Sequence, residues 1–188
     1  MQIGLCSKLI ITLIGCVLLF GCGGQQVNET VAEQQNAPPE VDKLARSYKN
    51  ICVYKFKASP EIESEYNQQI NDMQNSMVER LKTKQQFEQV EVSNQNQETD
   101  SDSLIVKTNI TYFDIVGFWK RGFSPWARSW IELDLQLIDS NTEEILRDEK
   151  MSSANNPMAA YFGWGGTDRS LPSDMGKTLA EYITLSMP

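Results

Sequence analysis

The sequence predicts an α/β (α+β) two-layer sandwich, in which a mixed, mainly antiparallel sheet of about five strands carries two helices on one face. Two patterns lead to this fold. Residues 131–137 alternate between apolar and hydrophilic side chains, as in a strand with one buried face. Residues 62–81 instead place apolar side chains three and four positions apart, as on one face of a helix.

The first strand is predicted over residues 50–57, which are rich in β-branched and aromatic side chains. Ser59 and Pro60 then indicate a helix start, because a hydroxyl can cap the first turn and proline suits its opening position. The predicted helix has about six turns. Its apolar stripe comprises Ile62, Tyr66, Ile70, Met73, Met77 and Leu81, and its opposite face is expected to be hydrated.

A short second strand is predicted over residues 87–92, and an exposed loop over 93–103, which has no apolar residue. A long third strand follows over 104–116. One of its faces carries Leu104, Val106, Ile110 and Tyr112, and the other carries Lys107, Asn109 and Thr111. By the same parity, Phe113, Ile115 and Trp130 are expected on the hydrated face.

The fourth strand buries Ile131, Leu133, Leu135 and Leu137 and exposes Glu132, Asp134 and Gln136. A turn at 139–142 leads to a charged fifth strand over 144–152, which suits a sheet edge. Residues 154–169 are rich in glycine and are expected to be irregular. The last helix begins at Ser173 and carries Met175, Leu179, Tyr182 and Ile183. Both helices are expected to cover the Leu133 face.

The first 22 residues have the marks of an export signal. Lys8 is the only charge before Glu29, an apolar run spans residues 9–20, and Gly21 precedes Cys22. The run is shorter than the roughly 20 residues of a membrane-spanning helix. The segment resembles a bacterial lipoprotein signal, which implies removal of residues 1–21 and anchoring of the chain in a membrane by acyl chains on Cys22. An ordinary secretory signal with a chance cysteine is the alternative.

The resemblance also implies a location. Gly23 rather than aspartate follows Cys22, which in the enteric sorting rule indicates an outer-membrane lipoprotein, here expected to face the periplasm. Residues 22–47 are then a lipidated, flexible tether, because they have too few large apolar side chains to form a core. Residues 48–188 are expected to form a single α/β sandwich domain.

Composition excludes several classes of function. The chain has 17 basic and 25 acidic residues and a net charge of −8, so nucleic acid is not an expected partner. It has no histidine, which excludes the usual serine or cysteine triads and histidine metal sites. Cys52 lies in a strand-like run and is expected to be buried rather than nucleophilic. Neither a metal nor another cofactor is expected.

Carboxylates offer the remaining chemistry. Glu98, Asp100 and Asp102 lie in a hydrophilic loop that lacks the glycine and terminal glutamate of a calcium-binding signature. Glu132 and Asp134 share one strand face about 7 Å apart, so a hydrolase that uses Asp134 is an alternative. The glycine-rich residues 163–166 lack the Lys-Ser pair of a phosphate-binding loop.

Aromatic and basic side chains gather between the third and fourth strands. They are Phe118, Trp119, Lys120, Arg121, Phe123, Trp126, Arg128 and Trp130. Aromatic residues with arginine are typical of binding hot spots, and tryptophan also suits bilayer interfaces. The segment is therefore a candidate partner-binding site, with a membrane-interface tip or a cell-wall glycan contact as alternatives. A further alternative is packing against Met158, Tyr161, Phe162 and Trp164, which would make it a cover for one end of the sheet.

From about Tyr48 onward the chain resembles a bacterial lipoprotein family known only as a domain of unknown function. The likeness rests on residues 51–56, on 81–92 and, most specifically, on 131–146. In the last segment the family usually has a Thr-Gly-Glu turn, and here Glu143 stands in the glycine position. The resemblance implies a fold similar to the amino-terminal domain of Tol translocation protein B, the curli secretion lipoprotein and lipoprotein activators of penicillin-binding proteins. It implies no catalytic residue.

The sequence therefore predicts a membrane-anchored envelope lipoprotein that acts as a non-enzymatic protein-interaction module. Its expected partners are the membrane, through the lipid on Cys22, and an envelope protein that docks on the segment from Phe118 to Trp130. A self-assembling structural or secretion-accessory lipoprotein, and hence a homo-oligomer, is the alternative.

Overall fold

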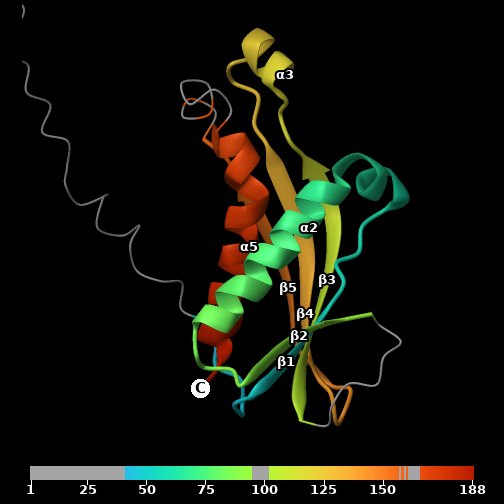
Figure 1. Ribbon diagram of the computed structural model, residues 1–188, viewed down its shortest axis with the longest axis vertical. Helices are drawn as coiled ribbons and strands as arrows, with labels where there is room; N and C mark the ends of the chain where they lie inside the picture. The colour runs from blue at the N-terminus through green and yellow to red at the C-terminus, as the bar shows by residue number, and fades with distance from the viewer. Residues whose placement is uncertain (1–40, 95–101, 157, 159, 161–165) are drawn as a thin grey trace, which may run out of the picture. The chain divides into compact units, whose positions relative to one another are not determined.

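Five strands form one mixed sheet in the computed structural model (Figure 1). The structure describes residues 41–94, 102–156, 158, 160 and 166–188. The strands lie in the order β2-β1-β3-β4-β5, with β1 parallel to β2 and β3, and the other pairs antiparallel. Their bounds are Asn50–Tyr54 for β1, Gln89–Ser93 for β2, Ser103–Asp114 for β3, Trp130–Asp139 for β4 and Ile145–Ala154 for β5. The predicted mixed sheet is confirmed.

Helices α2 (Pro60–Thr83) and α5 (Gly166–Ser186) lie side by side on one face of this sheet (Figure 1). The arrangement confirms the predicted two-layer α+β sandwich. α2 begins where the sequence predicts, because the hydroxyl of Ser59 accepts a hydrogen bond from the N–H of Ile62 at 3.4 Å. Acidic side chains in the first turn and basic ones in the last complement the helix dipole.

α5 begins at Gly166, earlier than the predicted Ser173. Pro172 lies inside the helix, where a proline removes one backbone hydrogen bond. Burial offsets that loss: Asp168 is 1% exposed and Leu171 is 5% exposed, so the first turns are fixed to the rest of the domain.

The core lies between the helices and the sheet. Its most deeply buried side chains include Ile51, Val53, Leu104, Val106, Ile110, Ile131, Leu133, Leu135 and Leu137 from the strands and Met73, Met77, Leu81, Met175, Leu179, Ala180 and Ile183 from the helices. The alternation of β4 and the stripe of α2 therefore predict the buried faces correctly. Cys52 is also buried, as expected.

The predicted faces of β3 are wrong beyond Ile110. A β-bulge between Ile110 and Tyr112 shifts the register against β4. Phe113 consequently packs in the core at 5% exposure, whereas Tyr112 is 48% exposed. Ile115 also packs against the core. Strict alternation fails at this point because a bulge places one extra residue in one strand.

The residues that precede β1 pack on the domain. Leu44 is buried, and its N–H donates to the carbonyl of Ser186 at 2.7 Å, near the end of α5. Tyr48 is buried as well. Residues 41–188 form one compact unit, so residues 41–47 belong with the domain, ahead of the predicted boundary at residue 48.

Candidate functional site

A short helix, α3 (Phe118–Phe123), stands at the end of the hairpin formed by β3 and β4 (Figure 1). Residues 117–128, the aromatic tip, comprise this helix and the turn that follows it. Three of its side chains are largely exposed: Trp119 at 78%, Phe123 at 90% and Trp126 at 73%. Clusters of exposed apolar side chains mark contact surfaces in folded proteins. The aromatic tip is therefore the candidate interaction site.

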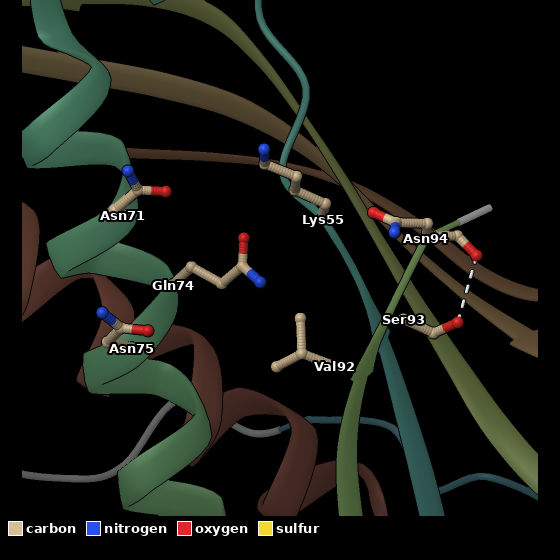
Figure 2. Close-up of a pocket in the computed structure, with 7 residues that line it drawn as sticks. All are labelled: Lys55, Asn71, Gln74, Asn75, Val92, Ser93 and Asn94. Carbon is tan, nitrogen blue, oxygen red and sulfur yellow. Dashed lines mark hydrogen bonds between the residues drawn. The ribbon is translucent and has the colours of Figure 1, made fainter.

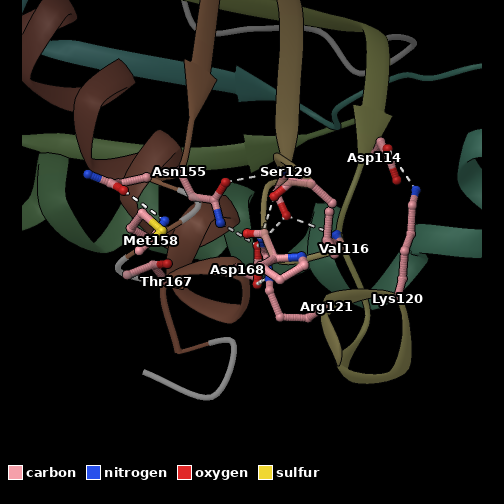
Figure 3. A network of polar contacts seen from close by, with 12 residues as sticks. Asp114, Val116, Lys120, Arg121, Ser129, Asn155, Met158, Thr167 and Asp168 are labelled. Atoms are coloured by element: carbon pink, nitrogen blue, oxygen red, sulfur yellow. Dashed lines mark hydrogen bonds and ion pairs between the residues drawn. The ribbon is translucent and has the colours of Figure 1, made fainter. Parts of the chain in front are cut away.

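Arg121 holds the backbone of the aromatic tip in place (Figure 3). Its Nη1 donates to the carbonyl of Pro125 at 3.3 Å and to that of Ala127. Its Nη2 and Nε donate to the carboxylate of Asp168 on α5, at 2.6 and 3.2 Å. Because Arg121 is buried, this predicted partner-binding residue faces the interior. It supports the exposed surface and does not form part of it.

Asp168 is the centre of a buried polar network (Figure 3). Its Oδ1 also accepts hydrogen bonds from the Ser129 hydroxyl at 2.5 Å and from the Asn155 amide. Asn155 Oδ1 accepts the N–H of Ser129 at 2.9 Å, and Ser129 Oγ accepts the N–H of Val116 at 2.9 Å. Ser129 is 0% exposed, so it is a structural group rather than a nucleophile. The network joins both strands of the tip hairpin to β5 and α5.

The partners of Arg121 do not follow from the local sequence. Ser129, Asn155 and Asp168 come from separate segments, and each is common in loops and helix starts. One signal was present: Arg121 lies in a segment without any acidic residue between Asp114 and Glu132. A buried arginine in such a segment needs a distant carboxylate, but the sequence alone does not identify which one.

Basic side chains flank the exposed aromatic rings. Arg128 is exposed, and Lys120 Nζ lies 3.5 Å from Asp114 Oδ2 at the end of β3. Arg121 is paired with Asp168 and Lys120 with Asp114, so Arg128 supplies the positive charge of the surface that these ion pairs do not balance. The rest of the chain is acidic, with a net charge of −8 overall. This local contrast favours a partner surface with acidic groups.

Of the remaining predicted site residues, Trp130 is described by the structure, whereas the side chains of several others are not. Trp130 is half-buried at the base of the hairpin, and its Nε1 donates to Glu132 Oε1 at 2.7 Å. The side chain of Phe118 lies outside the described part of the structure, as does Cys22. The same holds for Tyr161, Phe162 and Trp164, so packing of the two aromatic segments on each other stays a prediction. Met158 is 38% exposed.

Glu132 and Asp134, the paired carboxylates of β4, lie on the outer face of the sheet. Asp134 stands between Asn109 and Lys150 in the register of β3, β4 and β5. Within the described residues, no cluster of three or more cysteine, aspartate or glutamate side chains is arranged to hold a metal ion. The described helices also include none with the length and apolar character needed to cross a bilayer.

A second polar cluster lies at the opposite end of the sheet, in the turn between β4 and β5. The Tyr48 hydroxyl and Arg46 Nη2 donate to Asp139 Oδ2 at 2.7 and 2.5 Å. The N–H groups of Asn141 and Thr142 donate to Asp139 Oδ1 at 2.8 and 3.1 Å. The hydrogen bond from Tyr48, followed by these backbone donors and Arg46, lowers the pKa of Asp139 to about 2. Through Arg46 and Tyr48, the cluster holds the residues before β1 against this turn.

The similarity of this chain to known proteins lies in the fold. No protein-family model matches the sequence, and no curated protein matches it. Among solved structures, a DUF330 protein from Xanthomonas campestris has a TM-score of 0.51 and 11% identity, over 78% of this chain and 91% of that chain. This similarity confirms, at the level of fold, the predicted resemblance to a bacterial family of unknown function.

Two other solved structures are more distantly similar. PelC from Paraburkholderia phytofirmans, a dodecamer, has a TM-score of 0.44 and 9% identity, over 74% of this chain and 93% of that chain. TolB from Acinetobacter baumannii has a TM-score of 0.36 and 13% identity, over 78% of this chain and 30% of that chain. The predicted similarity to the curli secretion lipoprotein stays a prediction.

Proposed function

We propose that this chain is a lipid-anchored protein of the bacterial envelope, held in the outer membrane by Cys22, and that its domain is a non-enzymatic protein-interaction module. The aromatic tip is the surface that contacts an envelope protein. The domain supplies a rigid support for this surface, and residues 22–40 supply the tether.

One observation carries the proposal: three large aromatic side chains are exposed on a backbone that is itself firmly held. Trp119 and Phe123 project from α3, which also carries the buried Arg121, and Trp126 projects from the following turn, whose carbonyl groups accept hydrogen bonds from Arg121. A surface that is ordered before binding loses little conformational entropy when a partner docks. Aromatic side chains of this kind each contribute about 2 kcal/mol or more when they are buried at the centre of an interface.

The position of the aromatic tip also supports the proposal. The N–H of Leu44, near the start of the domain, donates a hydrogen bond to the carbonyl of Ser186 at the end of α5. That end of α5 and helix α3 lie at opposite ends of the domain (Figure 1). The described residues before β1 therefore enter the domain at the end away from the aromatic tip and leave the tip uncovered.

Site-specific photocrosslinking in the native host tests the proposal. A photoreactive residue replaces Trp126, and a matched variant carries it at Ile145, which is 52% exposed at the other end of the sheet. We expect a protein adduct from position 126 and not from position 145. Adding Trp119→Ala and Phe123→Ala should remove the adduct without lowering the thermal stability, because these side chains contact little of the core.

Two outcomes would contradict the proposal. Equal adducts from positions 126 and 145 would mean that the aromatic tip has no special role. Adducts with lipid or glycan alone would assign the tip to one of those partners. The anchor is tested separately: Cys22→Ser should release the chain from the membrane fraction, and a chain that stays there unchanged would disprove lipid anchoring.

Self-assembly is a second candidate function, and the open sheet favours it, since among the described strands β2 and β5 each have a single neighbour. The β5 edge opposes it, because the consecutive charges of residues 147–150 discourage pairing between edges. Sedimentation over a range of protein concentrations decides the matter. A single monomeric species throughout would reject self-assembly.

A further inference from the structure

A polar groove with a volume of about 490 Å³ lies between α2 and the β2 edge of the sheet (Figure 2). Its lining comprises Lys55, Asn71, Gln74, Asn75, Val92, Ser93 and Asn94. None of these residues belongs to the aromatic tip, so the groove is a separate surface from the one in the proposed function. The volume lies within the range typical of ligand sites.

The helix side of the groove is rich in amides, and one of them is held in a fixed orientation. Gln74 is 6% exposed, and its Oε1 accepts the N–H of Phe56 at 3.0 Å. This bond uses the acceptor of the amide and leaves Nε2 as a donor that faces the groove (Figure 2). Asn71 and Asn75 lie one turn apart on the same face of α2 and extend the amide surface.

The strand side supplies a positive charge and an apolar contact. Lys55 follows β1 and is exposed, and among the described residues it takes part in none of the ion pairs. Val92 on β2 is 51% exposed. A lysine ammonium beside an amide donor complements a carboxylate, and an exposed valine complements a β-branched side chain.

The backbone of β2 provides the third element of the site. The N–H of Lys55 donates to the carbonyl of Ser93 at 3.1 Å, so the carbonyl of Ser93 faces β1. Backbone groups of successive strand residues alternate in direction. The N–H and C=O of Val92 and Val90 therefore point away from β1, to the edge where the described residues supply no further strand.

The two edges of the sheet differ in how they are protected. β5 carries the four consecutive charges of residues 147–150, which oppose the addition of another strand. β2 carries one charged residue, Glu91. The β2 edge therefore opposes an added strand less than the β5 edge does, and it is also the edge beside the groove.

We propose that an extended acidic peptide segment of a partner protein binds here as an added strand beside β2. Its backbone bonds with the outward groups of Val90 and Val92. Alternate side chains of the added strand point toward α2, where a β-branched group contacts Val92 and a carboxylate meets Lys55 and the Nε2 of Gln74. The donor-rich groove determines the preference for an acidic residue, and the strand edge determines the extended conformation.

Panning a phage-displayed library of random peptides on the intact purified chain tests this proposal. We expect enrichment of peptides in which a glutamate or aspartate is spaced two positions from a valine, isoleucine or threonine. Binding of a synthetic peptide from this set should slow hydrogen exchange at the N–H groups of Val90 and Val92. Lys55→Gln should weaken binding about tenfold, while the matched variant Lys57→Gln should leave it unchanged.

Val92→Pro gives the sharpest test of strand addition. Proline removes the outward N–H of Val92 and should not disturb the ladder with β1, so binding should be lost while the circular dichroism spectrum is retained. If this variant does not fold, the same peptide with N-methyl groups at alternate residues serves instead and should fail to bind.

Three results would overturn the proposal. The first is a library that yields no enriched peptide. The second is an enriched peptide whose affinity is the same for the wild type, for Lys55→Gln and for Val92→Pro. The third is protection of Val90 and Val92 without any peptide, together with a concentration-dependent dimer that Val92→Pro abolishes. That last result would make a second copy of this chain the occupant of the β2 edge.

Discussion

Arg121 and Asp168 are 47 positions apart in the sequence and form a doubly hydrogen-bonded ion pair inside the protein. Their side chains are 4% and 2% exposed. This pair determines where the aromatic tip lies relative to α5. The removal of water from two charges is costly, so the pair adds less stability than its short distances suggest. Removing one member of the pair is also costly, because the other charge then stays buried without a partner.

Asp168→Ala should lower the free energy of unfolding by about 3–5 kcal/mol, since it leaves the Arg121 guanidinium buried and unpaired. Urea denaturation followed by circular dichroism measures the change. Glu181→Ala is the matched control: Glu181 binds Arg80 and Lys84 at 2.6 Å each on the surface between α2 and α5. That variant should cost about 1 kcal/mol or less. Equal losses in the two variants would contradict the role given to the buried pair.

Gly176→Ala should destabilise the domain by about 1–3 kcal/mol through overpacking. The added Cβ would lie 2.2 Å from the carbonyl oxygen of Met73, so α2 and α5 would have to move apart. Gly122→Ala in α3 is the control, because a Cβ there meets nothing within 4 Å. Alanine should raise helix propensity at that position by about 0.5–1 kcal/mol. Thermal melts of both variants should therefore shift in opposite directions.

Glu143→Gly should raise the free energy of unfolding by roughly 0.5–1 kcal/mol. Glu143 has a φ of 58° in the turn between β4 and β5, a left-handed conformation that glycine adopts without steric cost. Part of this gain is lost to the greater flexibility of glycine in the unfolded chain. Glu144→Gly, at a neighbouring position outside the left-handed region, should be destabilising. A stability loss in Glu143→Gly would show that the Glu143 side chain has a stabilising role of its own.

The stability of the domain should fall in acid as Asp139 is protonated. The pKa of Asp139 in the folded protein is about 2, against an ordinary value of 3.8. Its contribution is therefore present in full above about pH 4 and is lost as the pH falls through about 2. Asp139→Asn should flatten this part of the pH dependence, which urea titrations at several pH values measure. An unchanged slope in the variant would mean that other carboxylates govern acid unfolding.

Much of the fold follows from local sequence patterns. The stripe from Ile70 to Leu81 predicts the buried face of α2, and the alternation from Ile131 to Leu137 predicts that of β4, because each period belongs to one kind of element. The capping residue Ser59 predicts the first residue of α2 correctly. These features depend on residues that are close together in the sequence, so a single sequence is enough to predict them.

The features that escaped prediction depend on contacts between distant segments. The bulge after Ile110 exchanges the faces of Tyr112 and Phe113, and it is stabilised by the packing of Phe113 in the core. Gln74 lies on the buried face of α2, one turn from Ile70 and Met77, and its hydrogen bond with the distant Phe56 N–H satisfies a polar group that the apolar stripe does not account for. The sequence leaves open whether the rings of the aromatic tip are exposed or packed, and the inward direction of Arg121 depends on the position of Asp168, which local patterns do not give.

The hydrogen bond between Leu44 and Ser186 has a practical consequence. It brings the first and last described stretches of the domain together, at the end opposite α3 (Figure 1). A fluorescent tag or a biosensor linker attached at either stretch would therefore sit on the same side. If the protein were attached to a surface through either stretch, Trp119, Phe123 and Trp126 would face the solution.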